Sequence, residues 1–518
     1  MRVVGLPRIP LGMALVLAGM AGLVATTAFA PLSIWASPFV SLFVLLWALD
    51  GRTFRSGALI GLVYGFAFWA ALISWLTLYL GPIPWLALAI TESLYIALAA
   101  GFIALILTFG RHRWGRRGWW MYLSPLAVAG AWTAHEWLAS NWPWGGFSWA
   151  RFGTTQYDSP MHNALSWLGT SGLSFIIAWF TISLYQVFTA TRVNFRTLLP
   201  SAFAVLLTVL IPLFPTTYSD TMNIAGVQGN TKSGLFDVVE PGDNLAAHVE
   251  DTLTHVNSPV DLIVWPENAA DLDPTQFPSA AAAMNFINTK FDSPILTGTI
   301  TNPAPDTYFN SSILWRNGVV EAQYDKAHPV PFAEWMPARD FFHFLVPDLV
   351  DLVTRSYQFG TRPNVMNIDA HTVGVSICFD IVDDSLIRSM LVRGAQVVIA
   401  QTNNADFGTT YESAQQLEIA RVRALESGRY VLNVSTVGIT ALIAPDGTVS
   451  ESLQPFTRSA LQAQDVPLAR STPPGVFTSL AIDILATVIG LGIAALILID
   501  RVRRYRAARA NTPIVRRG

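Results

Sequence analysis

The pattern of apolar and polar positions divides the chain into three stretches. The first, residues 1–215, is a succession of apolar runs, each long enough to cross a bilayer as a helix of about 20 residues. A further apolar run covers residues 475–499, and a basic tail follows it. We predict eight spans, near residues 11–28, 33–50, 56–78, 84–109, 120–140, 166–189, 196–214 and 475–499.

The stretch between these runs has a different pattern. In residues 216–470 charges return, Pro and Gly interrupt the chain, and apolar runs shorten to strand length. Strand-like segments, such as DLIVWPE (261–267), alternate with helical ones, such as 411–427. Residues 312–326 read as a hairpin that turns at Asn317-Gly318, a pair that favours a type I′ turn. This alternation predicts an α/β domain.

The positions of the arginines predict the orientation of the chain. Arginines lie before the first span and in every second connection after it, while the intervening short loops carry only Arg151. Basic residues of short loops stay on the cytoplasmic side of a membrane. Seven spans then put the α/β domain outside, and the eighth returns the tail. We expect a multi-pass plasma-membrane protein with both termini in the cytoplasm.

The predicted division of the chain has four parts. These are a seven-span membrane domain, an extracytoplasmic α/β catalytic domain, an eighth membrane helix and a basic cytoplasmic tail, over residues 1–215, 216–470, 471–500 and 501–518.

Composition agrees with a membrane protein and excludes several functions. The chain is 52% hydrophobic and 13% charged, whereas soluble domains carry roughly 25% charged residues. The net charge of −3 and the lack of a basic excess exclude a nucleic-acid partner. One cysteine excludes an internal disulfide and a cysteine-based metal cluster. His135-Glu136 begins like a zinc motif, but its second histidine is missing, so we expect no metal.

The single cysteine lies where a nucleophile is often presented. Cys378 ends the strand-like segment VGVSIC, and Glu267 and Lys326 also follow predicted strands. Chemistry in α/β sheets gathers at such strand ends. A cysteine nucleophile needs a base for its proton and a cation for the developing oxyanion. Each residue alone is better explained as a buried thiol, a surface carboxylate or a solvated lysine; the combination predicts an active site.

Three motifs resemble those of a known superfamily. WPE (265–267), DKAHPVPFAEWMP (325–337) and SICFD (376–380) are similar to the motif blocks of the nitrilase, or carbon–nitrogen hydrolase, superfamily. With spans on both sides of such a domain, the chain resembles the membrane-embedded apolipoprotein N-acyltransferase family. HEWLASNWPWGGFSWARFG (135–153) also resembles that family's loop after the fifth span. The resemblance covers nearly the whole chain and implies an α-β-β-α sandwich.

The resemblance also implies roles for individual residues. Glu267 would be the general base, Cys378 the nucleophile and Lys326 the group that stabilises the oxyanion. Glu334 would support the site. The family often has Tyr-Glu after the cysteine, where this chain has Phe379-Asp380. The candidate substrate-binding residues are Phe379, Asp380, Phe236 and Asn310.

The implied reaction has a phospholipid donor and a lipoprotein acceptor. An acyl chain would pass from a membrane phospholipid, through a Cys378 thioester, to the N-terminal amine of the diacylglyceryl-cysteine of apolipoproteins. Because a thioester supplies the activation, we expect no metal and no soluble cofactor. We also expect a monomer. The aromatic loop 142–149 (WPWGGFSW) would admit acyl chains or form an ordinary interfacial belt.

Other interpretations remain open at this point. A membrane-tethered amidase or nitrilase would use the same three residues with water as the acceptor, although eight spans exceed what a tether requires. A non-enzymatic lipoprotein-binding scaffold would not need the intact residues. A transporter would carry more ionisable residues in its spans than Glu92 and the His135-Glu136 pair.

Overall fold

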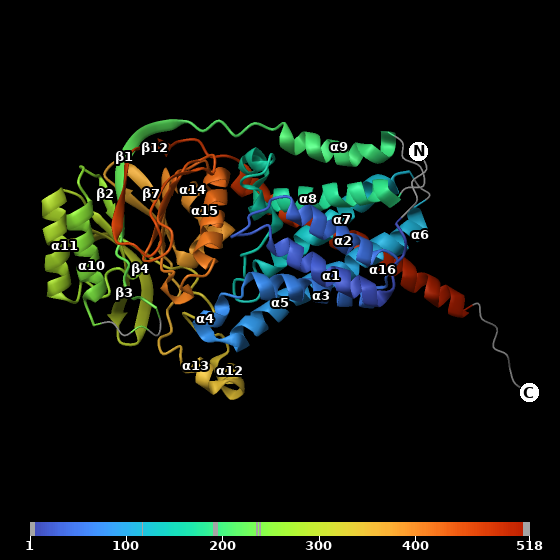
Figure 1. Cartoon of the computed structure of the whole chain (residues 1–518), viewed down its shortest axis with the longest axis horizontal. Coiled ribbons are helices and arrows are strands. Elements are labelled where there is room, and N and C mark those ends of the chain that lie inside the picture. Colours follow the sequence, from blue (N-terminus) through green and yellow to red (C-terminus); the bar gives the residue numbers. More distant parts are fainter. Residues whose placement is uncertain (1–5, 116–117, 190–194, 235–236, 238–239, 511–518) are drawn as a thin grey trace, which may run out of the picture.

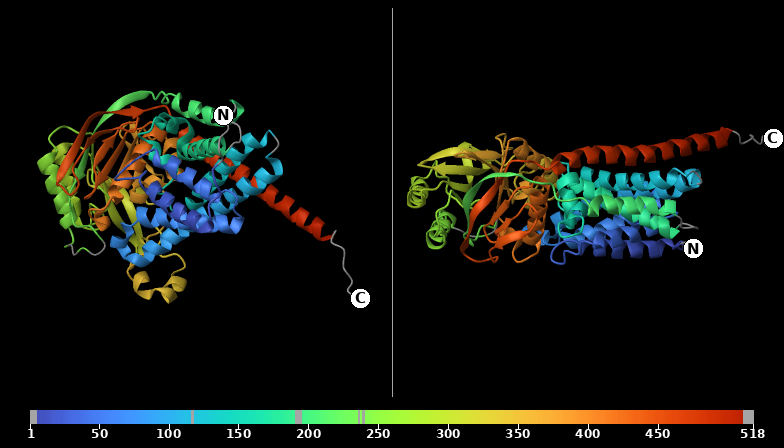
Figure 2. Two further views of the ribbon diagram at one scale, coloured as in Figure 1. Left: turned by 45° about the vertical axis from the view of Figure 1, so that its right-hand side comes forward. Right: turned by 90° about the horizontal axis from the view of Figure 1, so that it is seen from above.

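Apolar runs form a bundle of helices that makes up one end of the molecule. The computed structural model describes residues 6–115, 118–189, 195–234, 237 and 240–510. The bundle contains α1 (Leu11–Thr26), α2 (Ser37–Leu49), α3 (Phe54–Leu72), α4 (Leu76–Leu80), α5 (Pro82–Leu105), η1 (Ile106–Gly110), α6 (Arg111–Trp114), α7 (Trp120–Ala139), η2 (Phe152–Gln156), η3 (His162–Ala164), α8 (Leu165–Thr189), α9 (Phe195–Val209) and α16 (Gly475–Ala510). Its long helices lie alongside one another, and the α/β part sits at one end (Figures 1 and 2).

Helices occupy all eight predicted spans, so the multi-span helical fold class is confirmed. Within the described residues, four segments are long and apolar enough to cross a membrane, namely Phe54–Leu72, Pro82–Trp114, His162–Thr189 and Gly475–Arg504. Shorter apolar helices cover Leu11–Thr26, Ser37–Leu49 and Leu199–Val209. α7 has 20 residues but includes His135 and Glu136. The crossing of the membrane by α7 and by the shorter helices stays a prediction.

Glycines spaced four residues apart bring α3 close to α5. A Cβ atom on Gly57, Gly61 or Gly65 would clash with backbone or Cβ atoms of α5. Small residues at this spacing let two helix backbones pack closely in a membrane, where van der Waals contacts drive association. The helical part is therefore a packed domain and not a set of separate anchors.

The middle of the chain forms two six-stranded sheets. The first sheet consists of β1 (Tyr218–Gln228), β2 (Leu262–Val264), β3 (Ile295–Ala304), β4 (Thr307–Arg316), β5 (Val319–Asp325) and β12 (Ser459–Ala469), in the order β12-β1-β2-β3-β4-β5. The second consists of β6 (Val365–Ile368), β7 (His371–Ile377), β8 (Val397–Thr402), β9 (Val431–Ser435), β10 (Ala441–Ile443) and β11 (Val449–Ser452), in the order β11-β10-β9-β8-β7-β6.

Each sheet has a parallel centre and antiparallel edges. β1, β2 and β3 run parallel, as do β7, β8 and β9. The predicted hairpin is β4 and β5, and both residues of its turn have positive φ, 53° at Asn317 and 85° at Gly318, as a type I′ turn requires. The parallel centres put several strand ends at one edge of the sandwich, which is where a site is expected.

The two sheets face each other, and helices cover both outer faces. Ile224 and Val264 of the first sheet share one apolar core with Val375 and Ile399 of the second. α10 (Asp243–His255) and α11 (Pro278–Phe291) cover the first sheet, and α14 (Asp384–Val392) and α15 (Glu412–Ser427) cover the second (Figure 1). This layer order confirms the α-β-β-α sandwich that the resemblance implied.

α15 lies between the second sheet and the helical part, and it is enclosed along most of its length. Its buried polar side chains include Glu412, Gln415, Gln416, Glu418, Arg423 and Glu426. Glu418 accepts hydrogen bonds from Ser33 Oγ and from the Tyr157 hydroxyl, each at 2.5 Å, and both donors belong to the helical part. The interface between the two parts therefore includes specific hydrogen bonds from buried polar side chains of α15.

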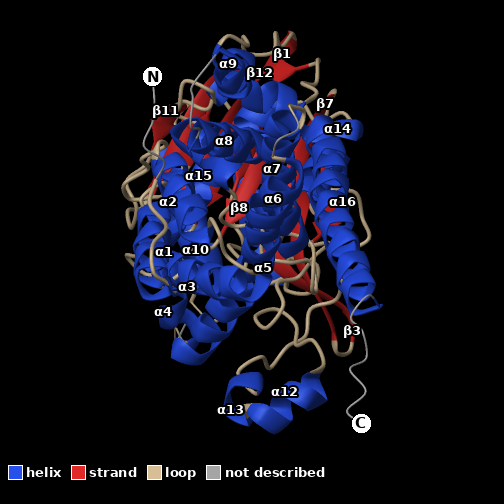
Figure 3. Ribbon diagram, turned by 90° about the vertical axis from the view of Figure 1, so that its right-hand side faces the viewer, coloured by secondary structure: helices blue, strands red, loops and turns tan. Residues whose placement is uncertain are grey.

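Two short helices follow the lysine motif and stand apart from both sheets (Figure 3). They are α12 (Arg339–Leu345) and α13 (Pro347–Val350). Phe341 and Phe344 of α12 are exposed, while Phe342 contacts the ring of Trp144 from the aromatic loop. α12 thus contacts the helical part through aromatic rings.

Candidate active site

Three strand ends bring the predicted site residues to one place. Glu267 lies just after β2, Lys326 directly follows β5, and Cys378 directly follows β7. β2 and β5 belong to the first sheet and β7 to the second, so the site forms where the two facing sheets end together. The side chains of Glu267 and Lys326 are 6% and 1% exposed, which excludes the interpretation of both as ordinary surface residues.

Cys378 begins a tight turn with an uncommon backbone conformation. It is the first residue of η4 (Cys378–Val382), a 3-10 turn, and its φ is +50°. A residue with a side chain adopts this region at a cost of about 1–3 kcal/mol, and it persists only where the surroundings fix it. Asp380 helps to fix the turn, because its carboxylate accepts the Ile377 N–H at 3.1 Å and the Tyr324 hydroxyl at 2.9 Å.

A lysine and two carboxylates form a compact group beside the cysteine. Lys326 Nζ lies 2.9 Å from Glu334 Oε2 and 3.9 Å from Glu267 Oε1. Asn310 Nδ2 donates to Glu267 Oε1 and to Glu334 Oε1, at 2.8 Å each. Asn310 therefore holds the two carboxylates at a fixed separation around the lysine. Glu334 is fixed further by the Val330 N–H, which donates to its Oε2 at 2.6 Å.

The electrostatics of the group favour a neutral thiol next to a base. Burial raises the pKa of Cys378 well above its usual range, and the charge of Glu267 adds to this while Lys326 opposes it. Burial also raises the pKa of Glu267, against the opposing effects of Lys326 and of hydrogen bonds from Asn310 and Cys378. Burial would lower the pKa of Lys326, but Glu334 and Glu267 outweigh it, and the net pKa is raised.

This arrangement can perform nucleophilic chemistry at a carbonyl group. A partly buried thiol beside a carboxylate can lose its proton as it attacks, because a carboxylate with a raised pKa is a stronger base. An ammonium group held by two carboxylates remains charged and can stabilise an oxyanion. Within the described residues, no group of three or more His, Cys, Asp or Glu side chains is placed to hold a metal ion.

The candidate substrate-binding residues fall in different places. Phe379 stacks on Phe147 and Trp149 of the aromatic loop, with ring centroids 5.7 and 6.1 Å apart. Asp380 is buried beneath the turn, where burial raises its pKa to about 7 against the opposing charge of Lys326. Phe236 lies outside the described residues. Asn310, as above, bridges the two glutamates.

Sequence reasoning missed Glu412 and Tyr79. Glu412 is buried at the start of α15, accepts from Asn404 Nδ2 at 2.8 Å, and has its pKa raised to about 8 by burial and also by the charge of Glu267. Tyr79 of α4 comes from the helical part, and its pKa is raised by burial and by charges that include Glu334. A glutamate in a segment of other polar residues carries no local signal; its burial was the missing information.

Comparisons with known proteins match both parts of the chain. The apolipoprotein N-acyltransferase N-terminal domain model matches residues 21–183, and the carbon-nitrogen hydrolase model matches residues 224–473. An apolipoprotein N-acyltransferase of Mycolicibacterium smegmatis is 32% identical over 468 residues, covering 82% of this chain and 75% of that protein. One from Photobacterium profundum is 28% identical over 479 residues, covering 89% and 90%.

A solved structure of a Nesterenkonia amidase from the nitrilase superfamily is also similar, with 16% identity and a TM-score of 0.38; the match covers 51% of this chain and 95% of the amidase. Both domain models and the two full-length relatives agree, and the chain belongs to the apolipoprotein N-acyltransferase family.

Proposed function

We propose that this acyltransferase works through a Cys378 thioester, with Glu267 as the base and Lys326 as the oxyanion-stabilising group. The observation that carries the proposal is the buried pair Glu267 and Lys326, 3.9 Å apart, beside Cys378, whose thiol pKa is affected by both of their charges. Glu334 is not a second base in this proposal. It holds the Lys326 ammonium in place at 2.9 Å.

The first half-reaction transfers the acyl chain to the enzyme. Glu267 takes the thiol proton while Cys378 Sγ attacks the ester carbonyl of a phospholipid, and Lys326 Nζ stabilises the oxyanion. When the tetrahedral intermediate collapses, the C–O bond breaks and the lysophospholipid alkoxide receives the proton from Glu267. The products are a thioester and a lysophospholipid, and Glu267 is again ionised.

The second half-reaction transfers the chain to a lipoprotein. The neutral N-terminal amine of a diacylglyceryl-cysteine attacks the thioester carbonyl, and Glu267 accepts the proton that the amine loses. The C–S bond then breaks, and the leaving thiolate is protonated by Glu267. The result is an N-acyl amide and the free enzyme, so the two substrates react one after the other in a ping-pong scheme.

The position of the site supports membrane-anchored substrates. Phe379, next to the nucleophile, stacks on Phe147 and Trp149 of the loop that follows α7. An aromatic surface continuous with the helical part suits an acyl chain that enters from the bilayer. We favour this over hydrolysis of a small amide, which needs water at the thioester and no aromatic path from the helical part.

Mass spectrometry of the intact protein tests the thioester. Detergent-purified enzyme incubated with phospholipid is expected to gain the mass of one acyl chain, removable by hydroxylamine, and Cys378→Ala is expected to gain none. Addition of a diacylglyceryl-cysteine peptide should then remove the adduct and give an N-acylated peptide. If neither adduct nor lysophospholipid forms, the mechanism is wrong and an amidase or a binding role gains support.

We also propose that the α/β domain faces outward, that both termini are cytoplasmic, and that one chain suffices for activity. The catalytic group, which consists of Glu267, Lys326, Glu334 and Cys378, comes entirely from a single chain, and this supports a monomer. The Cys378→Ala background contains no cysteine, so single cysteines report on topology. A membrane-impermeant maleimide on intact cells with a permeable outer envelope should label Asp446→Cys and not Ala510→Cys. The reverse labelling would overturn the orientation.

A further inference from the structure

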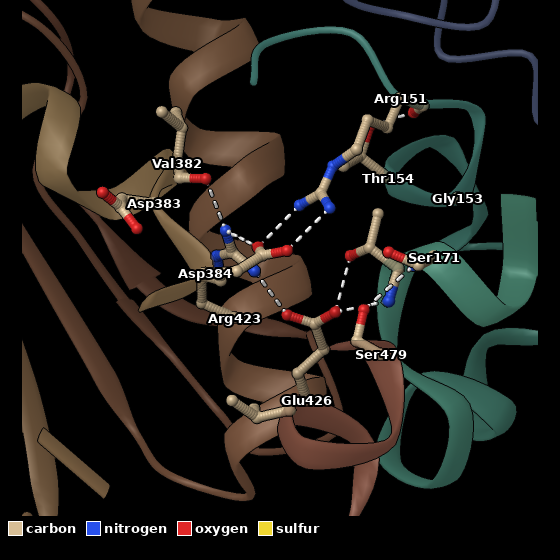
Figure 4. A network of polar contacts seen from close by, with 12 residues as sticks. Arg151, Gly153, Thr154, Ser171, Val382, Asp383, Asp384, Arg423, Glu426 and Ser479 are labelled. Atoms are coloured by element: carbon tan, nitrogen blue, oxygen red, sulfur yellow. Dashed lines mark hydrogen bonds and ion pairs between the residues drawn. The ribbon is translucent and has the colours of Figure 1, made fainter. Parts of the chain in front are cut away.

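Four charged side chains join the helical part to the α/β part beside Val382, the last residue of the cysteine turn (Figure 4). Both terminal nitrogens of Arg151 donate to Asp384, one to each carboxylate oxygen, at 2.7 Å. Arg423 Nη2 lies 2.7 Å from Asp384 Oδ1, and Arg423 Nη1 donates to Glu426 Oε2 at 2.7 Å. We refer to Arg151, Asp384, Arg423 and Glu426 as the interface network.

Each charge of the interface network has an opposite partner, but Arg151 Nε is buried without a hydrogen bond, and the network is not an obvious source of stability. Its two positive and two negative groups balance; the side chains of Arg151, Arg423 and Glu426 are 5%, 3% and 2% exposed, and that of Asp384 is 26% exposed. Burying ion pairs costs desolvation that often cancels their attraction, so such pairs are better explained by what they position. The bidentate fork of Arg151 on Asp384 fixes orientation as well as distance.

On one side, the interface network holds the end of the cysteine turn. Arg423 Nε donates to the Ile381 carbonyl at 2.8 Å, and Arg423 Nη2 donates to the Val382 carbonyl at 2.7 Å. These are the last two residues of the turn that begins at Cys378. Because Cys378 has a φ of +50°, its conformation persists only while both ends of the turn are held.

On the other side, two segments of the helical part contact the interface network directly, and a third segment packs against one of them. Arg151 lies in the loop that follows α7. Thr170 of α8 donates to Glu426 Oε1 through its N–H at 2.5 Å and its hydroxyl at 2.6 Å. The next residue, Ser171, donates its N–H to Ser479 Oγ of α16 at 3.3 Å. The position of the turn therefore depends on contacts with the helical part.

We infer that Arg151 and Asp384 are positioning residues, through which the membrane helices hold Cys378 in its reactive conformation. The inference rests on the proposed role of Cys378 as the nucleophile. Arg151 fixes Asp384, Asp384 orients Arg423, and Arg423 holds the turn. Loosening this chain of contacts leaves Glu267 and Lys326 in place but misaligns the Cys378 thiol, and a displacement of about 1 Å in a reacting group can cost about 100-fold in rate.

The test is a charge-neutral double variant, Arg151→Met/Asp384→Asn, which leaves Arg423 paired with Glu426. The chain offers a matched control in Arg421→Met/Asp158→Asn, because Arg421 also joins α15 to the helical part, with two hydrogen bonds at 3.0 and 2.5 Å to Asp158 between η2 and η3. That pair is more exposed, at 17% and 55%, and the Arg421 Nε donates to Gly447, away from the cysteine turn.

Two measurements separate positioning from folding. The first is the rate of Cys378 thioester formation at saturating phospholipid together with the phospholipid KM. The second is the pH profile of Cys378 alkylation by iodoacetamide, which reports on one thiol because the chain has one cysteine. For the network variant we expect a 10- to 100-fold lower rate, a KM within about threefold and a shifted alkylation profile. The control variant should match wild type within twofold.

The outcomes are distinguishable from those of the proposed function. If wild type forms no thioester, the proposed function fails first. If wild type forms it and the network variant does so at the control's rate, the positioning inference alone is wrong. Should the network variant not fold, Arg151→Lys replaces it, because lysine keeps the charge and loses the bidentate fork. A wild-type rate in Arg151→Lys, with Asp384→Glu also at the wild-type rate, would likewise overturn the inference.

Discussion

Two largely buried charge clusters lie near the cysteine turn, and they differ in the balance of positive and negative groups. The catalytic group sets the two carboxylates of Glu267 and Glu334 against one lysine, next to a neutral thiol. The interface network sets two carboxylates against two arginines. The cluster with an excess of negative charge can take up a proton. In the balanced cluster each carboxylate is stabilised by an arginine, so protonation is unfavourable.

The pKa shifts express this difference. In the interface network, burial works to raise the pKa of Asp384, but Arg151 and Arg423 outweigh it and the net pKa is lowered. In the catalytic group, burial raises the pKa of Glu267 despite Lys326. A matched cluster thus fixes geometry over a wide pH range, and an incompletely matched one is prepared for proton transfer.

In the catalytic cluster, replacement of the base, Glu267, should lower the rate of thioester formation more than any other change. Glu267→Gln keeps an oxygen that can accept from Asn310 but cannot take the thiol proton, so we expect thioester formation to fall by about 10³-fold. Quantitative mass spectrometry of the acyl adduct measures this rate. A variant that retains more than a tenth of the wild-type rate would show that another group is the base.

Removal of the lysine should come next. Lys326→Met leaves two carboxylates without their cation and removes the charge that stabilises the oxyanion, and we expect a loss of about 10²–10³-fold in the rate at saturating phospholipid. The control is Lys326→Met/Glu334→Gln, which restores a single negative charge. If the second change recovered most of the rate, the main role of Lys326 would be to neutralise Glu334.

A smaller effect is expected at the aromatic contact between the two parts. Phe379→Ala removes the ring that stacks on Phe147 and Trp149, and loss of such a buried aromatic contact should lower lipid acyl transfer about tenfold. Phe379→Tyr keeps the ring and serves as the matched control, with a rate close to wild type. Alkylation of Cys378 by a small reagent should change little in either variant, and an equal loss there would indicate a distorted turn instead.

The smallest effect is a pH dependence of stability. Burial raises the pKa of Asp380 to about 7 from its usual 3.8, so the unfolded chain releases this proton at lower pH than the folded one. Stability from this group is full below about pH 4 and is lost as pH rises towards 7. The melting temperature of wild type in detergent should therefore decrease relative to Asp380→Asn by a few degrees between about pH 5 and 7.

The pKa of Asp384 is shifted in the opposite direction, so the same melting measurement should show a different pH dependence for this residue. Its folded pKa is lowered, so its stabilisation is present above the unfolded pKa and is lost only at lower pH. Asp384→Asn should therefore give a constant offset from wild type between pH 5 and 7. A sloping offset at Asp384 would contradict the matched charges of the interface network, and a flat offset at Asp380 would contradict the raised pKa of that buried carboxyl group.

Much of the fold and the site could be predicted from local patterns. Apolar runs gave the helices because a membrane helix needs little more than length and apolarity, and strand ends located Glu267, Lys326 and Cys378. The motif resemblance added Glu334. The role of Asn310 as a bridge between two glutamates, 2.8 Å from each, could not be read locally because those residues are 43 and 24 positions away.

By itself, the sequence determined which segments are helices and strands, the family, and the types of residue available for the chemistry, because each is encoded over short distances along the chain. Only the tertiary structure decided which charges pair. Arg151, the one basic residue in the predicted outer loops, meets Asp384 across 233 positions and is buried there. Such pairing depends on how whole domains dock, and the positive φ of Cys378 depends in turn on the contacts that docking supplies.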